Sequence, residues 1–191
     1  MTNKSVLIAY GTRYGSTEEI VFEIEKILNN EGLATSTVNL REIEKKDWPS
    51  IDEYDAILVA TGISFSRWTK ESKNFLKKNI NTFKLNGKKL GVFVVCGDAT
   101  APDERPKVRA DFIEKVLKKL DVQADIYDAF GGVLDFSPSS PKGKLAKILL
   151  KIAIKKRGKT LEIDFNGRND FRDWTQIQNY AQKFASLVEE S

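Results

Sequence analysis

The sequence predicts a doubly wound α/β fold, in which five parallel strands take the order 2-1-3-4-5 and helices cover both faces of the sheet. Short apolar runs alternate with segments of helical periodicity, which is typical of parallel strands joined by crossover helices. A loop rich in glycine and hydroxyl residues follows the first apolar run, near the edge where such sheets bind ligands. The length of 191 residues is enough for one domain with a substantial core.

Each predicted element has its own local signal. The first strand contains the apolar run Val6-Leu7-Ile8-Ala9, and Gly32 ends the helix that follows it. We predict strands at residues 5–9, 35–40, 56–61, 89–95 and 124–133, and helices at 17–30, 70–79, 105–120 and 173–189. Residues 1–191 are expected to form a single domain, in which an insert at about 136–168 breaks the alternation after the fifth strand.

The first loop, Tyr10-Gly11-Thr12-Arg13-Tyr14-Gly15-Ser16-Thr17, combines the groups that bind a phosphate. At the start of a helix the backbone N–H groups lack partners, and the helix dipole favours an anion. The two glycines allow tight backbone geometry, and the hydroxyl side chains donate hydrogen bonds. The alternative is a helix cap alone, with Ser16 as the N-cap and Glu19 completing a capping box.

Two further loops should meet the first loop, because the carboxyl ends of neighbouring parallel strands lie at one edge of the sheet. They are Thr61-Gly62-Ile63-Ser64-Phe65-Ser66-Arg67-Trp68, after the third strand, and Cys96-Gly97-Asp98-Ala99-Thr100-Ala101-Pro102-Asp103, after the fourth. A planar ring could lie between Trp68 or Phe65 and the later loop, whose N–H groups at Gly97 and Asp98 would bond its polar edge. Packing is the alternative for Trp68, and it is the favoured interpretation for Phe65.

The residue types that are missing exclude several kinds of chemistry. The sequence has no histidine, which removes the usual general base, the usual zinc site and a Ser-His-Asp triad. The one cysteine, Cys96, excludes an internal disulfide and a cysteine metal cluster, so no metal site is expected. A single cysteine, no signal peptide and no apolar run of membrane-spanning length predict a protein of the reducing cytoplasm. Any redox chemistry would come from a bound cofactor.

The insert carries an uneven share of the net charge of +4. No acidic residue lies between Asp135 and Glu162, whereas basic residues run from Lys142 to Lys159. One helical face between the lysines is apolar, with Leu145, Ile148, Leu149 and Ile152. Such a helix either packs on the domain with its lysines extended into solvent, or touches a membrane interface or an acidic partner.

The first loop resembles the phosphate loop of flavodoxins, which places hydroxyl residues around a glycine and ends in threonine. With the two later loops the resemblance covers the whole chain, and it is closer to the flavodoxin-like menaquinone-dependent protoporphyrinogen oxidases. That branch has a hydroxyl-Thr-Arg-x-Gly-x-Thr loop, matched here by Thr12-Arg13-Tyr14-Gly15-Ser16-Thr17 with Gly11 at the first position. An aromatic loop at 63–68, a basic insert and the Asp173-Trp174 pair opening the last helix are similar as well. Ser137-Pro138-Ser139-Ser140-Pro141 stand where the branch has aromatic residues.

The resemblance implies that the ligand is FMN. Its phosphate would bind mainly to backbone N–H groups of the first loop, and its ring would lie between the two later loops. Arg13 would face solvent, because the phosphate loops of this family use neutral donors. The implied cofactor-binding residues are Thr12, Arg13, Tyr14, Gly15, Ser16, Thr17, Thr61, Gly62, Ile63, Trp68, Cys96, Gly97 and Asp98, and no catalytic residue is assigned.

Three functions are compatible with these features. The first is an FMN-dependent oxidoreductase that resembles quinone-linked protoporphyrinogen IX dehydrogenase, with water, Asp98, Asp103 or a tyrosine transferring protons. The second is a flavodoxin-type electron carrier for a protein partner, although such carriers are typically acidic. The third is a binding module without flavin. A redox protein or a quinone is the expected partner, with peripheral contact to the inner face of the membrane through the segment from Lys142 to Lys159; no nucleic acid is expected.

Overall fold

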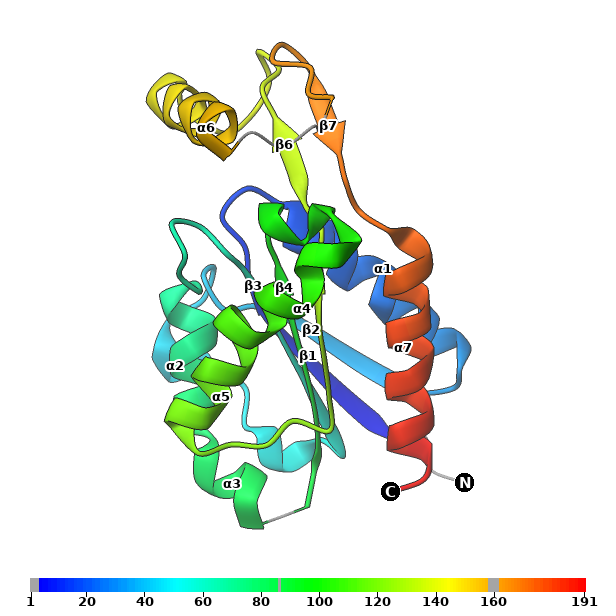
Figure 1. The fold of residues 1–191 in the computed structure, drawn as a ribbon. Helices are drawn as coiled ribbons and strands as arrows, with labels where there is room; N and C mark the ends of the chain where they lie inside the picture. Colours follow the sequence, from blue (N-terminus) through cyan, green and yellow to red (C-terminus); the bar gives the residue numbers. More distant parts are fainter. Residues whose placement is uncertain (1–3, 86, 158–161) are drawn as a thin grey trace.

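A computed structural model of the chain describes residues 4–85, 87–157 and 162–191. Its main sheet is parallel and has the strand order β2-β1-β3-β4-β5, which confirms the predicted fold class (Figure 1). The strands are β1 (Ser5–Gly11), β2 (Ala34–Asn39), β3 (Ala56–Gly62), β4 (Lys89–Val95) and β5 (Ile126–Phe130). The order changes direction between β1 and β3, so a crevice forms outside the carboxyl ends of these strands.

Helices cover both faces of the sheet (Figure 1). One face carries α1 (Ser16–Asn30) and α7 (Trp174–Glu189), and the other carries α2 (Lys70–Lys78), α3 (Ile80–Leu85), α4 (Arg105–Arg109) and α5 (Lys115–Leu120). Successive side chains of a strand point to opposite faces, so Val6 and Ile8 pack under α1 while Leu7 and Ala9 pack into the other core. Burial on both faces explains why the inner strands are continuous apolar runs.

The predicted helix at 105–120 is interrupted by a π-helical segment, Ala110–Glu114, which lies between α4 and α5. A π-helical turn inserts one extra residue into the helical ladder and often marks a functional site. Here the segment carries Phe112, which is one of the residues that line the cavity described below. Helical periodicity alone predicts the element but does not reveal this turn.

The expectation of one strand over 124–133 is wrong. β5 ends at Phe130, and the chain then enters a separate strand, β6 (Val133–Asp135), which pairs antiparallel with β7 (Arg168–Asp170). Gly131 lies at the break, where a Cβ atom would be 2.1 Å from the carbonyl oxygen of Phe171. Two backbones cross at this point, and only a residue without a side chain lets them approach so closely.

The insert stands at the carboxyl end of the sheet, where β6 and β7 form a two-stranded stalk beside α6 (Lys144–Arg157) (Figure 1). The predicted basic run from Lys142 to Lys159 extends beyond α6, and its last lysine lies outside the described residues. Among the helices of the described ranges, none combines the length and the apolar character needed to cross a membrane.

Two arginines tie the base of the insert to α1. Arg168 Nη2 lies 2.9 Å from Glu19 Oε2, and Arg172 Nη1 lies 2.7 Å from the same oxygen. The side chain of Arg172 is only 4% exposed, donates from Nε to Asp170 and lies 4.5 Å from the ring centroid of Trp174. A guanidinium that bonds two carboxylates and stacks on an indole holds the stalk against the domain.

Candidate functional site

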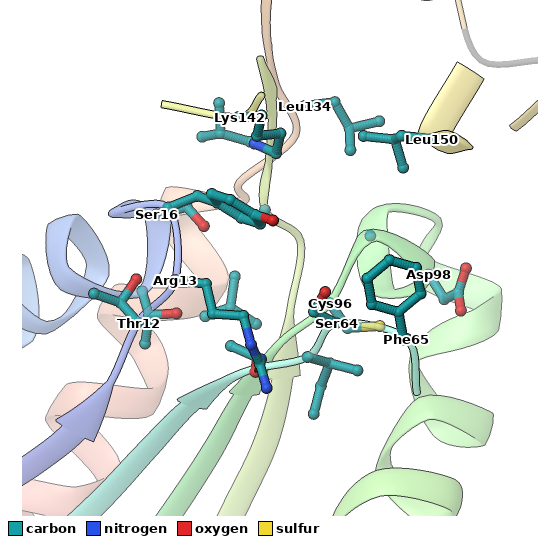
Figure 2. Close-up of a pocket in the computed structure, with 18 of the residues that line it drawn as sticks. Thr12, Arg13, Ser16, Ser64, Phe65, Cys96, Asp98, Leu134, Lys142 and Leu150 are labelled. Carbon is teal, nitrogen blue, oxygen red and sulfur yellow. Dashed lines mark hydrogen bonds between the residues drawn. The ribbon is translucent and has the colours of Figure 1, made fainter. Parts of the chain in front are cut away.

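A cavity of about 310 Å³ lies between the carboxyl edge of the sheet and the insert (Figure 2). Three loops from the sheet form its floor and the insert forms its roof. Its lining residues include most of the predicted site: Thr12, Arg13, Tyr14, Ser16, Thr17, Gly62, Ile63, Cys96, Gly97 and Asp98. The three loops predicted to meet therefore do meet, because the strand order brings their carboxyl ends together.

The first loop ends in a glycine that caps α1. Gly15 is the N-cap and has a φ of 88°, and its N–H donates to Thr12 Oγ1 at 3.0 Å. The predicted capping box is wrong: Ser16 is the first helical residue and lines the cavity, and the Glu19 carboxylate bonds arginines of the insert instead. No side chain caps the first turn of α1, so its amides are available to an anion.

The other glycine of this loop has a packing role. A Cβ on Gly11 would lie 2.2 Å from Thr69 Oγ1 and 2.7 Å from Ser72 Oγ. Thr69 is the N-cap of α2, and its hydroxyl lies 3.1 Å from that of Thr61, which is fully buried. Thr61 therefore supports the floor of the cavity from below and does not line it.

The second loop, which we call the ring loop (residues 62–68), forms a small hairpin. Ser64 and Arg67 exchange two backbone hydrogen bonds of 3.1 Å, and the two residues between them have left-handed backbones. These are Phe65, with a φ of 49°, and Ser66, with a φ of 58°. Two left-handed residues make a type I′ turn, which normally uses glycine or asparagine. The turn holds the 80%-exposed Phe65 side chain at the cavity (Figure 2).

Of the two aromatic residues of the ring loop, Phe65 lines the cavity and Trp68 packs in the core, which is the reverse of the expectation. Trp68 is 6% exposed, packs in the core and donates from Nε1 to the carbonyl oxygen of Phe112 at 2.5 Å, so it does not line the cavity. Phe65, for which packing was favoured, is the residue that does line it. Trp68 directly precedes the N-cap Thr69, whereas Phe65 stands between two serines, and this pattern could have distinguished them.

The third loop brings its backbone close to the cavity. The N–H of Cys96 donates to the carbonyl oxygen of Phe130 at 2.9 Å, and the chain then turns into a short 3₁₀ segment, Gly97–Thr100. The nearest atom to a Cβ built on Gly97 is 4.0 Å away, on Leu134 of the roof, so no atom crowds the backbone at this glycine. A flat ligand has room to approach the loop here.

The roof of the cavity was not predicted. Among the described residues it is apolar apart from Lys142, and its members are Val133, Leu134, Lys142, Ala146, Leu149, Leu150 and Ile154. The Lys142 ammonium lies 4.5 Å from the ring centroid of Tyr14, which joins the insert to the first loop. Burial lowers the pKa of Lys142, while the nearby Asp135 carboxylate opposes the shift. An anionic group in the cavity would stabilise the charged form of this lysine.

Arg13 departs from the expectation that it faces solvent. Its guanidinium is half-buried and donates to two carbonyl oxygens of the ring loop, at Gly62 and Trp68. The cavity side of the first loop is thereby left with neutral donors, namely hydroxyls and amides, which is what the resemblance implies for a phosphate loop. Neutral donors at a helix start, an open glycine backbone and an exposed aromatic ring fit the phosphate and the flat ring of FMN.

Comparisons with known proteins identify the family to which the chain belongs. The sequence profile of the flavodoxin domain matches residues 7–160. Protoporphyrinogen IX dehydrogenase (quinone) of Escherichia coli K12 is 24% identical to the chain over 184 residues, which cover 96% of each protein. A flavodoxin from Streptococcus pneumoniae TIGR4 has a TM-score of 0.54 at 17% identity, over 97% of this chain and 98% of that one.

A larger protein contains a similar fold. Rubredoxin oxygen:oxidoreductase from Desulfovibrio gigas has a TM-score of 0.61 at 14% identity over 97% of this chain, which spans only 36% of that protein. The two structural likenesses concern the fold, whereas the sequence profile covers the first loop, the ring loop and the third loop. The chain therefore belongs to the flavodoxin family, and FMN is its cofactor.

Proposed function

We propose that this chain is an FMN-dependent oxidoreductase that oxidises an apolar, anionic substrate of the porphyrinogen type and passes the electrons to a quinone. The observation that carries the proposal is the roof, which encloses an apolar space with one lysine above the flavin loops. An electron carrier has no need of such a compartment. The similarity to a dehydrogenase named for protoporphyrinogen IX and quinone, over 96% of both chains, supports the same substrate class.

The first loop would hold the cofactor by its phosphate. Thr12, Ser16 and Thr17 line the cavity with hydroxyls, and the amides at the start of α1 supply further donors. The ring would lie between Phe65 and the backbone at Gly97. When bound, FMN supplies the redox chemistry of the site, and the protein supplies orientation and electrostatics.

The roof would orient the substrate and exclude water. Leu134, Leu150 and Ile154 line the cavity, and their apolar character favours an apolar ring system over bulk solvent. Lys142 stands at the Tyr14 side and would pair with a carboxylate of the substrate. Since the chain has no histidine, a proton would move through water or through Asp98, which lines the cavity.

The outer face of α6 is proposed to rest on an anionic membrane surface, where a lipid-soluble quinone is found. Leu145 is 70% exposed and Ile148 is 54% exposed, whereas Ala146 and Leu150 on the inner face line the cavity. Lys144 is exposed on the neighbouring side of the helix. An apolar stripe bordered by lysine is the pattern of a helix that lies in a membrane interface.

Substrate turnover tests the proposed activity. The FMN-loaded protein is mixed anaerobically with protoporphyrinogen IX and a short-chain quinone, and the fluorescence of the porphyrin product is followed. We expect formation well above the spontaneous rate, and we expect Lys142→Gln to raise KM about fivefold with little change in kcat. Lys144→Gln, an exposed lysine of the same insert, is the matched control. Formation at the spontaneous rate would favour the electron-carrier function instead.

Vesicle binding tests the membrane contact separately. The triple variant Leu145→Gln, Ile148→Gln and Ile152→Gln removes the outer apolar face of α6. We expect it to stop sedimenting with anionic phospholipid vesicles, whereas Phe22→Gln, which removes a 51%-exposed apolar side chain from α1, should sediment as the wild type does. Undiminished sedimentation of the triple variant would contradict the membrane contact.

A further inference from the structure

Arg13 joins the first loop to both ends of the ring loop. Its Nη1 atom donates to the carbonyl oxygen of Gly62 and its Nη2 atom to that of Trp68, each at 2.9 Å. The two carbonyls are six positions apart in the sequence, yet one planar guanidinium spans them. In Figure 2 the side chain of Arg13 runs away from Ser16 and Lys142, toward the ends of the strands.

The ring loop needs external support because its own conformation is costly. Phe65 and Ser66 both have left-handed backbones, in a region that residues other than glycine rarely occupy. Each end of the loop is bonded to another part of the domain. The N–H of Ile63 donates to the carbonyl of Val95 at 2.8 Å, and the Trp68 indole donates to the Phe112 carbonyl. Arg13 adds the bridge that links the two ends to each other.

Arginine is suited to this bridge by its shape and charge. The guanidinium presents donors in a rigid fork, whereas a lysine ammonium at the same place would reach one carbonyl at a time. Burial lowers the pKa of Arg13 and the nearby Arg41 lowers it further, while the Glu71 carboxylate opposes the shift. The guanidinium donates to two carbonyl oxygens of the ring loop. Donors engaged in this way are directed at the ring loop and away from the helix start that binds an anion.

We propose that Arg13 is a positioning residue that holds the ring loop in the shape that receives the flavin ring, and that it does not bind the phosphate. Arg13 therefore strengthens binding of the flavin ring alone. Because riboflavin has the same ring and lacks the phosphate, Arg13 strengthens the binding of riboflavin and of FMN by the same factor. This inference rests on FMN as the cofactor and does not depend on which substrate is oxidised.

The Arg13→Lys variant tests this role, because it keeps the charge near the cavity and removes the fork. Dissociation constants for FMN and for riboflavin are measured separately by quenching of flavin fluorescence. We expect both constants to rise by the same factor, about tenfold, which corresponds to about 1.4 kcal/mol, and their ratio to stay at the wild-type value. Arg67→Lys, an exposed arginine of the same loop, should change neither constant.

Two results would overturn the proposal. Weaker binding of FMN with unchanged binding of riboflavin would make Arg13 a phosphate ligand, and unchanged binding of both would remove its positioning role. Hydrogen exchange in the flavin-free protein supplies an independent measurement: the amides of Ser64 and Arg67, which close the hairpin, should exchange several-fold faster in Arg13→Lys. Equal exchange in the two proteins would also contradict the proposal, and urea unfolding checks that the variant is folded.

Discussion

A single methyl group at Gly131 tests the junction between the sheet and the insert. A Cβ at this position lies 2.1 Å from the carbonyl oxygen of Phe171 and 3.0 Å from its carbonyl carbon. A comfortable contact is about 3.5 Å, so Gly131→Ala forces the two backbones apart by about 1.4 Å. The clash is with main chain, so no side-chain rotation relieves it, and the hydrogen bond from the Phe171 N–H to the Gly132 carbonyl is strained.

The expected cost follows from these two effects. Overpacking in a close contact costs about 1–3 kcal/mol, and weakening one backbone hydrogen bond costs about 1 kcal/mol. We therefore expect Gly131→Ala to lower the free energy of unfolding by about 3 kcal/mol. A protein of this size then loses about 6–12 °C in Tm, and it still folds if its total stability is of the usual order of 5–15 kcal/mol.

Urea unfolding followed by circular dichroism measures this loss, with Gly143→Ala as the control. Gly143 lies in the same insert, and a Cβ there meets no atom within 4 Å, so its substitution should stay within about 0.5 kcal/mol of the wild type. The reasoning is refuted if Gly131→Ala also stays within about 0.5 kcal/mol with an unchanged urea slope, because the two backbones would then separate at no cost.

Three further predictions concern the site and the base of the insert. Phe65→Ala should weaken FMN binding about tenfold without changing Tm. Trp68→Phe deletes the buried indole donor and should lower the free energy of unfolding by about 1–2 kcal/mol. Equal effects of the two variants on stability would contradict the assignment of Phe65 to the cavity and Trp68 to the core. Arg172→Met should lower the free energy of unfolding by about 2 kcal/mol and should make proteolysis of the insert faster. Arg172→Lys keeps the charge but not the planar fork, so its free energy of unfolding should lie between those of Arg172→Met and the wild type. The Arg172 guanidinium holds the pKa of Asp170 below its ordinary value of 3.8, so this carboxylate stabilises the fold above about pH 4 and loses its effect as the pH falls through the lower, folded-state pKa. In Asp170→Asn the free energy of unfolding should therefore fall less steeply below about pH 4 than in the wild type. The same pH dependence in both proteins would count against the ion pair between Asp170 and Arg172.

The fold and the first loop could be predicted because both depend on local sequence. Apolar runs buried on two faces predict parallel strands, and the strand order then determines which loops meet. The glycine and hydroxyl pattern from Thr12 to Thr17 predicts an anion site, because a helix start needs only its own backbone to bind one. Even here, the alternative with Ser16 as the N-cap is wrong and Gly15 is the cap, since sequence alone does not reveal a φ of 88°.

The aromatic assignment of the ring loop could not be made from composition. Trp68 and Phe65 are both large and apolar, and the deciding partner of Trp68 is the carbonyl of Phe112, in a π-helical turn more than forty residues later. The role of Arg13 was missed for the same reason, because its acceptors are backbone carbonyls that carry no sequence signature. Contacts of this kind depend on how distant segments pack.

The sequence by itself determined the α/β fold and the strand order, and it predicted the helix start after Thr12 to which we assign phosphate binding, since these follow from periodicity and backbone chemistry within short segments. The tertiary structure decided that the insert becomes a roof, that Phe65 reaches the cavity, and that Arg13 supports the ring loop from below. The reason is physical: α6 carries apolar side chains on more than one side, and the path of the chain through β6 and β7 places the side with Ala146, Leu150 and Ile154 over the three loops.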